Sequence, residues 1–155
     1  MNPALPREIH TVLIPVGGAR VLLPNAIVAE IASFDDLEKI DNAPSWLLGR
    51  LPWRDGTVPV VSFPALTGTG ALEESRLARV AILRTLDGKT HLPHIGLVSL
   101  GLPRLTTVTP DLLVRTDDGK QLPHGINAHV LVRSDQAVIP DLHWIETKVA
   151  QALDV

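Results

Sequence analysis

The chain contains no cysteine and no tyrosine, and its only aromatic side chains are three tryptophans and two phenylalanines. Without cysteine, a disulfide framework and every thiolate metal site are excluded. Proteins that bind single-stranded nucleic acid stack bases on aromatic rings, and this chain has few rings to offer. Its formal net charge of −3 also provides no general basic face for a duplex. We therefore expect no nucleic-acid partner.

Long apolar runs are missing as well. No stretch approaches the roughly 20 apolar residues that a membrane-spanning helix needs. Residues 1–8 show no basic region followed by an apolar segment, which is the pattern of a secretion signal. These features favour a cytoplasmic protein without direct membrane insertion. Hydrophobic residues nevertheless make up 45% of the chain and the mean hydropathy is +0.21, which predicts a folded domain with a real core.

Short apolar runs separated by turn residues fill most of the sequence. Gly17-Gly18 and Asp55-Gly56 each lie between two such runs, which is a strong signal for a β-hairpin. Many short strands with frequent turns predict an all-β barrel or sandwich. The predicted strands are residues 12–16, 20–23, 27–32, 49–53, 57–63, 77–86, 94–100, 112–115, 127–133 and 137–139.

Two helical segments are predicted. Residues 43–49 have room for one helical turn that ends at Gly49. The C-terminal segment predicts a longer amphipathic helix, because Asp141 can cap its start and apolar residues follow on one face at helical spacing. The helix is expected to pack on the β core, with a partner-binding helix as the alternative. Its apolar face consists of Leu142, Ile145, Val149, Ala152 and Leu153.

Four of the six histidines come in pairs, His91 with His94 and His124 with His129. Catalytic zinc needs three rigid ligands and an open fourth position, whereas side chains three apart in a strand point to opposite faces. The chain also has no Gly-x-Ser-x-Gly nucleophile turn and no complete phosphate-binding loop. The pattern favours ordinary surface histidines, with no metal, cofactor or catalytic residue. A small hydrolase that holds a metal on these histidines is the alternative.

Glu30 is unusual among the acidic residues because Val28 and Ile31 lie on either side of it. A buried carboxylate without a partner is strongly destabilising, so Glu30 needs a cation or hydrogen-bond donors nearby. Arg54, which follows Trp53 in the predicted hairpin, is the candidate partner. Tryptophan is more often a core residue, but an exposed one anchors protein interfaces well. Both readings of Trp53 stay open.

Residues 43–63 resemble the signature of CheW-like chemotaxis coupling proteins. That signature runs as a proline, an apolar turn, Gly-Val-x-Asn-Leu-Arg-Gly, two further residues and Val-Pro-Val-x-Asp-Leu. Residues 28–31 resemble the family's Val-x-Glu-Ile, residues 94–98 its Val-Gly-Leu-x-Val strand, and residues 125–139 its closing hairpin. The resemblance extends from about residue 11 to residue 152. The positions that align without a gap in the central block are Gly49, Arg54, Val58, Pro59 and Val60.

The resemblance implies an all-β fold of two intertwined five-stranded SH3-like β-barrels with a C-terminal helix. It implies one domain over residues 1–155, with residues 20–85 in one barrel lobe and residues 11–19 plus 86–155 in the other. It also implies a non-catalytic adaptor that bridges a chemoreceptor's cytoplasmic tip to the regulatory domain of a CheA-type histidine kinase. An apolar groove between the barrels would receive the receptor, and one barrel end would dock on the kinase.

Five residues are expected to contact or support these partners, four of them through the resemblance and Trp53 because an exposed tryptophan anchors interfaces well. Val28 would line the receptor groove, and Glu30 and Arg54 would form an ion pair that braces it. Gly49 would lie at the barrel end used for docking, with a helix-ending glycine as its structural alternative. Trp53 would serve as an aromatic anchor in the same region.

The sequence also departs from the family signature. Pro52, Asp55 and Ser62 stand where the signature has Asn, Gly and Asp, and Ser99 replaces the Asp that usually follows Gly-Leu-x-Val. These departures indicate a divergent branch similar to the accessory proteins of chemosensory systems that control type IV pili and twitching motility, the ChpC or PilI kind. They leave open whether coupling to the kinase is kept. A ligand-binding β-barrel of the same fold is a further alternative.

Overall fold

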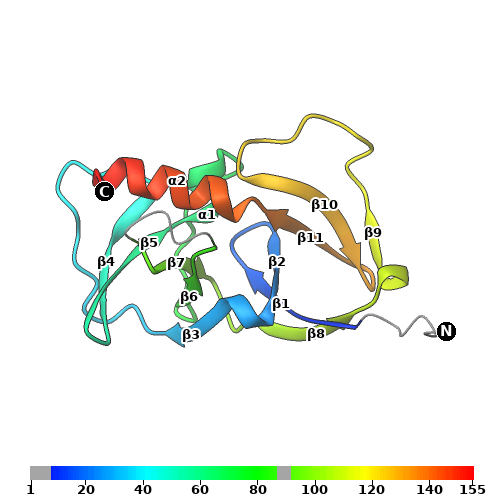
Figure 1. Cartoon of the computed structure of the whole chain (residues 1–155), viewed down its shortest axis with the longest axis horizontal. Helices are drawn as coiled ribbons and strands as arrows, with labels where there is room; N and C mark the ends of the chain where they lie inside the picture. The colour runs from blue at the N-terminus through cyan, green and yellow to red at the C-terminus, as the bar shows by residue number, and fades with distance from the viewer. Residues whose placement is uncertain (1–7, 87–91) are drawn as a thin grey trace.

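Two curled β-sheets lie side by side in the computed structural model, which describes residues 8–86 and 92–155 (Figure 1). One sheet has six strands in the order β8-β1-β2-β11-β10-β9, and the other has five in the order β3-β6-β7-β5-β4. The strands of the first sheet are β1 (Ile9–Pro15), β2 (Arg20–Pro24), β8 (Arg104–Val108), β9 (Leu113–Arg115), β10 (Ile126–Val132) and β11 (Asp135–Pro140). The strands of the second are β3 (Val28–Ala32), β4 (Leu47–Trp53), β5 (Gly56–Val61), β6 (Arg79–Arg84) and β7 (His94–Ser99).

Four short or terminal helices complete the described elements. They are η1 (Asn25–Ile27), α1 (Phe63–Thr67), η2 (Pro110–Leu112) and α2 (Leu142–Leu153). The side chain of Asp141 accepts a hydrogen bond from the Trp144 N–H at 3.1 Å, so the predicted cap of the terminal helix is confirmed. No helix among the described residues has the length and apolar content needed to span a bilayer.

The expected all-β class with one C-terminal helix is confirmed, and both predicted hairpins are present. β1 pairs with β2 around Gly17 and Gly18, which have positive φ angles of 106° and 65°. β4 pairs with β5 from Leu47 to Trp53. One strand, β8, was not predicted from the sequence. Its Thr-Thr-Val run is β-branched and could have indicated a strand.

The division of the chain between the lobes differs from the expected one at two strands. β2, expected in the lobe of residues 20–85, stays with β1 in the six-stranded sheet because its two-glycine turn keeps it antiparallel to β1. β7, expected in the lobe of residues 11–19 plus 86–155, pairs along its whole length with β6 in the five-stranded sheet. The chain therefore crosses between the sheets after β2 and again after β7, which makes the two halves intertwined.

Three clusters of buried side chains account for this arrangement. One cluster lies inside the six-stranded sheet and includes Leu13, Val130 and Val132. A second lies inside the five-stranded sheet and includes Leu51 and Ile82. The third and largest joins residues of both sheets with α2. Each curled sheet therefore has its own core, and a shared core holds the two together.

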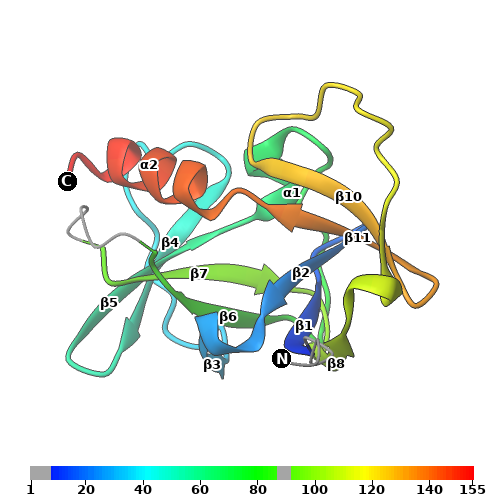
Figure 2. The ribbon, with the colours of Figure 1, turned by 45° about the vertical axis from the view of Figure 1, so that its right-hand side comes forward.

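The terminal helix closes the shared core. Ile145 and Val149 are buried as predicted from the sequence, and α2 lies over the five-stranded sheet in both views (Figures 1 and 2). Ala152, which was expected on the buried face, is exposed, and Ala150 is buried in its place. The buried face of α2 is therefore rotated about the helix axis by a fraction of a turn relative to the predicted face.

The helical turn predicted at residues 43–49 is wrong, because β4 begins within it at Leu47. Leu47, Gly49 and Leu51 alternate on the buried face of β4, which is a strand pattern with period two. Gly49 does not end a helix. It lies in the strand with a φ of +157°, and a Cβ atom placed there would be 2.2 Å from the backbone oxygen of Glu38.

Candidate functional site

One end of the five-stranded barrel carries a set of contacting polar and aromatic side chains, which we call the Trp53 cluster. It consists of Glu30, Trp53, Arg54, Arg84 and His94. Trp53 ends β4, which is one edge strand of the sheet, and Glu30 lies in β3, the other edge strand. The indole Nε1 of Trp53 donates a hydrogen bond to Glu30 Oε2 at 3.0 Å. Two side chains from opposite edges of the sheet therefore meet, because the sheet curls into a barrel.

A backbone bridge supports the same closure. Glu38, in the segment between β3 and β4, pairs with Arg50 as an isolated antiparallel bridge. The Glu38 N–H donates to the Arg50 carbonyl at 2.8 Å, and the Arg50 N–H donates to the Glu38 carbonyl at 2.7 Å. Gly49 lies directly beside this bridge, which explains why the position has no room for a side chain. Gly49 therefore contributes to closure of the barrel.

His94 and Arg84 extend the cluster across β6 and β7. The two residues lie directly opposite each other in the antiparallel pair. The imidazole of His94 meets the indole of Trp53 edge-on, with ring centres 4.7 Å apart and planes at 67°. Arg84 Nη1 donates to the carbonyl oxygens of Ala26 at 2.7 Å and Val28 at 3.1 Å. The guanidinium of Arg84 is thus held at the barrel end.

Arg54 stacks on Trp53 and does not reach Glu30. It occupies the tight turn between β4 and β5 with a φ of 52°, and its guanidinium carbon lies 4.2 Å from the centre of the Trp53 ring. Glu30 and Arg54 are both described residues, and no ion pair joins them. The predicted ion pair is therefore wrong. The reason is that both side chains contact Trp53 instead. The indole N–H donates to the Glu30 carboxylate, and the Arg54 guanidinium stacks on the indole ring.

The positive charges of the cluster act on His94. Partial burial of the imidazole lowers the pKa of His94 below its ordinary value of 6.5, and the charges of Arg54 and Arg84 lower this pKa further. Protonation of His94 would place a third positive charge beside the two arginines. The surroundings therefore favour neutral imidazole.

Of the five residues predicted from the sequence, the structure brings three together directly. Glu30, Trp53 and Arg54 share the Trp53 cluster, and Val28 contacts it through the carbonyl that accepts from Arg84. The side chain of Val28 is half-buried and packs against the shared core, so it does not line the cavity between the sheets. His94 and Arg84 were missed as members. Their cross-strand pairing could be found only once the β6–β7 register was known.

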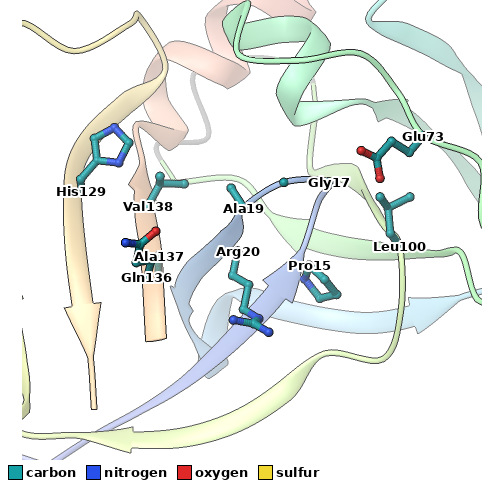
Figure 3. Close-up of a pocket in the computed structure, with 11 residues that line it drawn as sticks. Pro15, Gly17, Ala19, Arg20, Glu73, Leu100, His129, Gln136, Ala137 and Val138 are labelled. Atoms are coloured by element: carbon teal, nitrogen blue, oxygen red, sulfur yellow. The ribbon is translucent and has the colours of Figure 1, made fainter. Parts of the chain in front are cut away.

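A groove lies between the two sheets, and we call it the inter-sheet groove (Figure 3). It has a volume of about 550 Å³. His129 and Gln136 of the six-stranded sheet face Glu73 and Leu100 across it, with the β1–β2 turn between them. At its base the Leu100 N–H donates to the Pro15 carbonyl at 2.8 Å, which ties the two sheets together. A groove between the barrels was predicted, but its lining residues were not.

A second hollow lies at the opposite end of the five-stranded barrel from Trp53, and we call it the barrel-end hollow. It has a volume of about 520 Å³. Leu48 at the start of β4 and Val98 near the end of β7 line it, together with Phe34. The loop before β6 covers one side, and its Leu72 is 41% exposed. This apolar hollow lies next to Gly49, at the barrel end where docking was expected.

The histidines do not gather at one site. His94 contacts Trp53, His124 stacks on Trp144 with ring centres 6.0 Å apart, and His129 lines the inter-sheet groove. His91 lies outside the described residues. Within residues 8–86 and 92–155, no group of three or more histidine and carboxylate side chains is placed to hold a metal ion. The alternative of a histidine-metal hydrolase is not supported.

Comparison with known proteins agrees with this architecture. Residues 10–145 match the model of the CheW-like domain family. The chain is similar in structure to the scaffolding protein TtCheW from Thermoanaerobacter tengcongensis, with 16% sequence identity and a TM-score of 0.75, over 94% of this chain and 92% of that chain. A search of curated proteins finds no match. The structural likeness shows a shared fold, and the family match spans both sheets. The chain therefore belongs to the CheW-like domain family of scaffold and coupling proteins in chemotaxis signalling.

Proposed function

We propose that this protein is a cytoplasmic adaptor that couples the signalling tip of a chemoreceptor to the regulatory domain of a CheA-type histidine kinase, without catalysing a reaction. The observation that carries the proposal is the presence of two hollows on a CheW-like fold, one between the barrels and one at a barrel end. An adaptor needs two surfaces that can be occupied at the same time. Different residues line the two hollows except for Glu73, which borders both, and this supports assigning one partner to each.

We assign the receptor tip to the inter-sheet groove. The groove has apolar side chains on its floor, including Leu100 and Val138, and polar side chains such as Arg20 and Gln136 around them. An apolar centre with a polar rim is the usual anatomy of a protein interface. A helical hairpin could place apolar side chains on the floor while its polar side chains contact the rim.

We assign the kinase domain to the barrel-end hollow. Its lining is mainly apolar, and the partly exposed Leu72 projects beside Phe34 and Leu48. Closed barrels have few free strand edges, so their ends are where apolar side chains can meet a partner. The Trp53 cluster lies at the other end of the same barrel and stays accessible in this arrangement.

Two substitutions separate the assignments. Ala19 is exposed in the β1–β2 turn and lines the inter-sheet groove, so Ala19→Trp should fill the groove and weaken binding of a receptor-tip peptide by about tenfold or more. Leu72→Asp should weaken binding of the kinase regulatory domain in the same way. Each variant is the control for the other, because it should keep the partner that it does not touch. Absence of binding of the unmodified chain to both partners at micromolar concentration would contradict the adaptor function.

The branch within the family is a narrower proposal. We infer membership of the type IV pilus branch from the departures at Pro52, Asp55 and Ser62. Ser62 keeps one property of the aspartate that it replaces, because its hydroxyl caps α1 by accepting from the Ala65 N–H at 3.4 Å. Deletion of the gene in its source should impair twitching motility if the branch is right. Impaired swimming with normal twitching would assign the chain to a flagellar system instead.

A further inference from the structure

A further hollow lies between α2, α1 and the segment that leads into β4, and we call it the two-tryptophan hollow. It has a volume of about 440 Å³. Trp144 and Lys148 of α2 line it together with Trp46, which directly precedes β4. The other lining residues are Pro44, Leu66, Gln151 and Ala152. None of these residues lines the inter-sheet groove or the barrel-end hollow, so the surface is separate from both.

Both tryptophans are half-buried and pack against the shared core. The Trp46 carbonyl accepts a hydrogen bond from the Ser62 N–H at 2.9 Å, which anchors the segment before β4. The ring of Trp144 stacks on His124 with ring centres 6.0 Å apart, and Lys148 Nζ lies 5.5 Å from the centre of the indole. No ring contact joins the two indoles within the described part of the chain. They are therefore two separate and ordered platforms, which lose little conformational entropy when a ligand binds.

The lining of this hollow is rich in hydrogen-bond donors and poor in acceptors. Among residues 8–86 and 92–155, Trp53 is the tryptophan whose indole N–H donates to a protein group. The N–H groups of Trp46 and Trp144 have no such acceptor and are open to solvent. Lys148 adds an ammonium group, and the amide of Gln151 supplies the one side-chain oxygen of the lining. A ligand with free carbonyl groups and few N–H groups suits this lining.

Proline has that chemistry, because each proline residue carries a backbone carbonyl and no N–H. A proline-rich segment adopts the polyproline II conformation, which has no internal hydrogen bonds and so leaves its carbonyl groups free. Its rings dock on surfaces lined by aromatic side chains. A strand or a helix suits the hollow less well. None of the lining residues lies in a strand to which another could be added, and a helix uses most of its carbonyl groups internally.

The charge of Lys148 adds a second requirement for the ligand. Within the part of the chain that the structure describes, the ion pairs involve three arginines and no lysine. The ammonium group of Lys148 therefore has no carboxylate partner there, although it lies over the ring of Trp144. An acidic residue beside the prolines would complement this charge at the edge of the hollow.

We propose that the two-tryptophan hollow docks a proline-rich segment of a partner protein, in the polyproline II conformation, with an acidic residue at one end. Proline rings pack on Trp46 and Trp144, and the two indole N–H groups donate to carbonyl oxygens of the segment. The acidic residue pairs with Lys148. The proposal does not rest on the adaptor function, because the hollow shares no lining residue with the surfaces assigned to the receptor and the kinase.

An NMR titration of the full chain with a hexaproline peptide that ends in glutamate tests the proposal. We expect the indole N–H signals of Trp46 and Trp144 to shift at millimolar peptide concentration. The indole N–H signal of Trp53 should stay in place, because it is bonded to Glu30 outside the hollow, and it is the internal control. A peptide with alanine in place of every proline should shift none of the three signals.

Two variants separate the contributions of shape and charge. Ala152 is exposed on α2, so Ala152→Arg should obstruct the hollow without disturbing the core and weaken binding by roughly tenfold. Ala71→Arg makes the same change at an exposed alanine outside the hollow and should leave binding unchanged. Lys148→Gln should weaken binding of the peptide that ends in glutamate by roughly threefold, the scale of one surface ion pair. A hexaproline peptide that ends in glutamine should bind this variant and the unmodified chain equally.

Several results would overturn the proposal. They are unchanged Trp46 and Trp144 signals with the proline peptide, equal shifts with the alanine peptide, and equal losses of affinity in Ala152→Arg and Ala71→Arg. Indole signals that shift with protein concentration in the absence of peptide would assign the hollow to a second copy of the chain and would also overturn it. Failure of the unmodified chain to bind a receptor tip or kinase domain would reject the adaptor function and leave the result for this hollow unaffected.

Discussion

The indole nitrogen of Trp53 donates a 3.0 Å hydrogen bond to the carboxylate of Glu30, and this bond joins the two edge strands of the five-stranded sheet. Edge strands leave backbone groups unpaired, and closing a sheet into a barrel is one way to protect them. Here the Glu38–Arg50 bridge pairs backbone groups on the edge of β4. The hydrogen bond between Trp53 and Glu30 joins β4 to β3 at the barrel end. Substitutions at Glu30 or Trp53 would therefore act on barrel closure as well as on any partner.

Replacing Trp53 with Phe removes the indole donor and keeps a ring beside His94. We expect the free energy of unfolding to fall by about 1 kcal/mol, the usual net contribution of one hydrogen bond. Chemical denaturation measures this change. A double-mutant cycle with Glu30→Ala should show a coupling of about 0.5–1 kcal/mol between the two positions.

The matched cycle pairs Glu30→Ala with Arg54→Ala. Since no ion pair joins these residues, their effects on unfolding should add to within about 0.5 kcal/mol. A coupling between Glu30 and Arg54 as large as that between Glu30 and Trp53 would show that the arginine, and not the indole, stabilises the carboxylate.

Substitution of Gly49 should destabilise the fold before it affects any partner. In Gly49→Ala the new Cβ would lie 2.2 Å from the Glu38 oxygen, so the Glu38–Arg50 bridge must break or shift. We expect a loss of about 3 kcal/mol or more in unfolding free energy. Gly56→Ala is the control, because a Cβ there meets nothing within 4 Å. A change of less than about 0.5 kcal/mol in both variants would mean that Gly49 is not required for closure.

Titration of His94 should make stability depend on pH below its ordinary pKa. The folded-state pKa is lowered from 6.5, first by burial and then by Arg54 and Arg84, so the unfolded chain binds more protons as the pH falls. The contribution of His94 is therefore complete above pH 6.5 and is lost as the pH falls through the folded-state pKa. Thermal unfolding between mildly alkaline and acidic pH should show a smaller loss of Tm in His94→Gln. Identical pH profiles for both proteins would contradict this effect.

Asp117 should anchor the loop that leads from β9 to β10. Its buried carboxylate accepts hydrogen bonds from Arg115 Nε at 2.7 Å and from the N–H groups of Gly119 and His129, each at 3.2 Å. Burial alone would raise the pKa of Asp117, but these bonds together lower it below 3.8. Stability from this group is therefore present above pH 3.8 and lost as the pH falls through the folded-state pKa.

Asp117→Asn tests the anchor at neutral pH. The amide keeps the size of the carboxylate but removes its charge, so the bond from Arg115 should weaken. We expect faster hydrogen exchange at the Gly119 and His129 amides. Asp118→Asn, an exposed neighbour, is the control. Equal exchange rates in all three proteins would show that the charge of Asp117 is not needed.

Several elements could be predicted from the sequence because they depend on neighbouring residues. The β1–β2 hairpin follows from Gly17 and Gly18 between apolar runs, and the start of α2 follows from Asp141 before an apolar stripe. Turns and caps involve residues only a few positions apart, so their signals are local. The same locality explains one error: the segment around Gly49 has a plausible helical turn, but the pairing of β4 with β5 makes it a strand from Leu47 on.

The composition of the Trp53 cluster was decided by tertiary structure. The sequence predicted an ion pair between Glu30 and Arg54 and, separately, an aromatic anchor at Trp53. The curl of the five-stranded sheet brings β3 against the end of β4, and the conformation of Arg54 directs its guanidinium onto the indole. His94 and Arg84 join only through the register of β6 with β7. Which strands share a sheet, and which side chains meet at its end, depends on long-range pairing that no local pattern encodes.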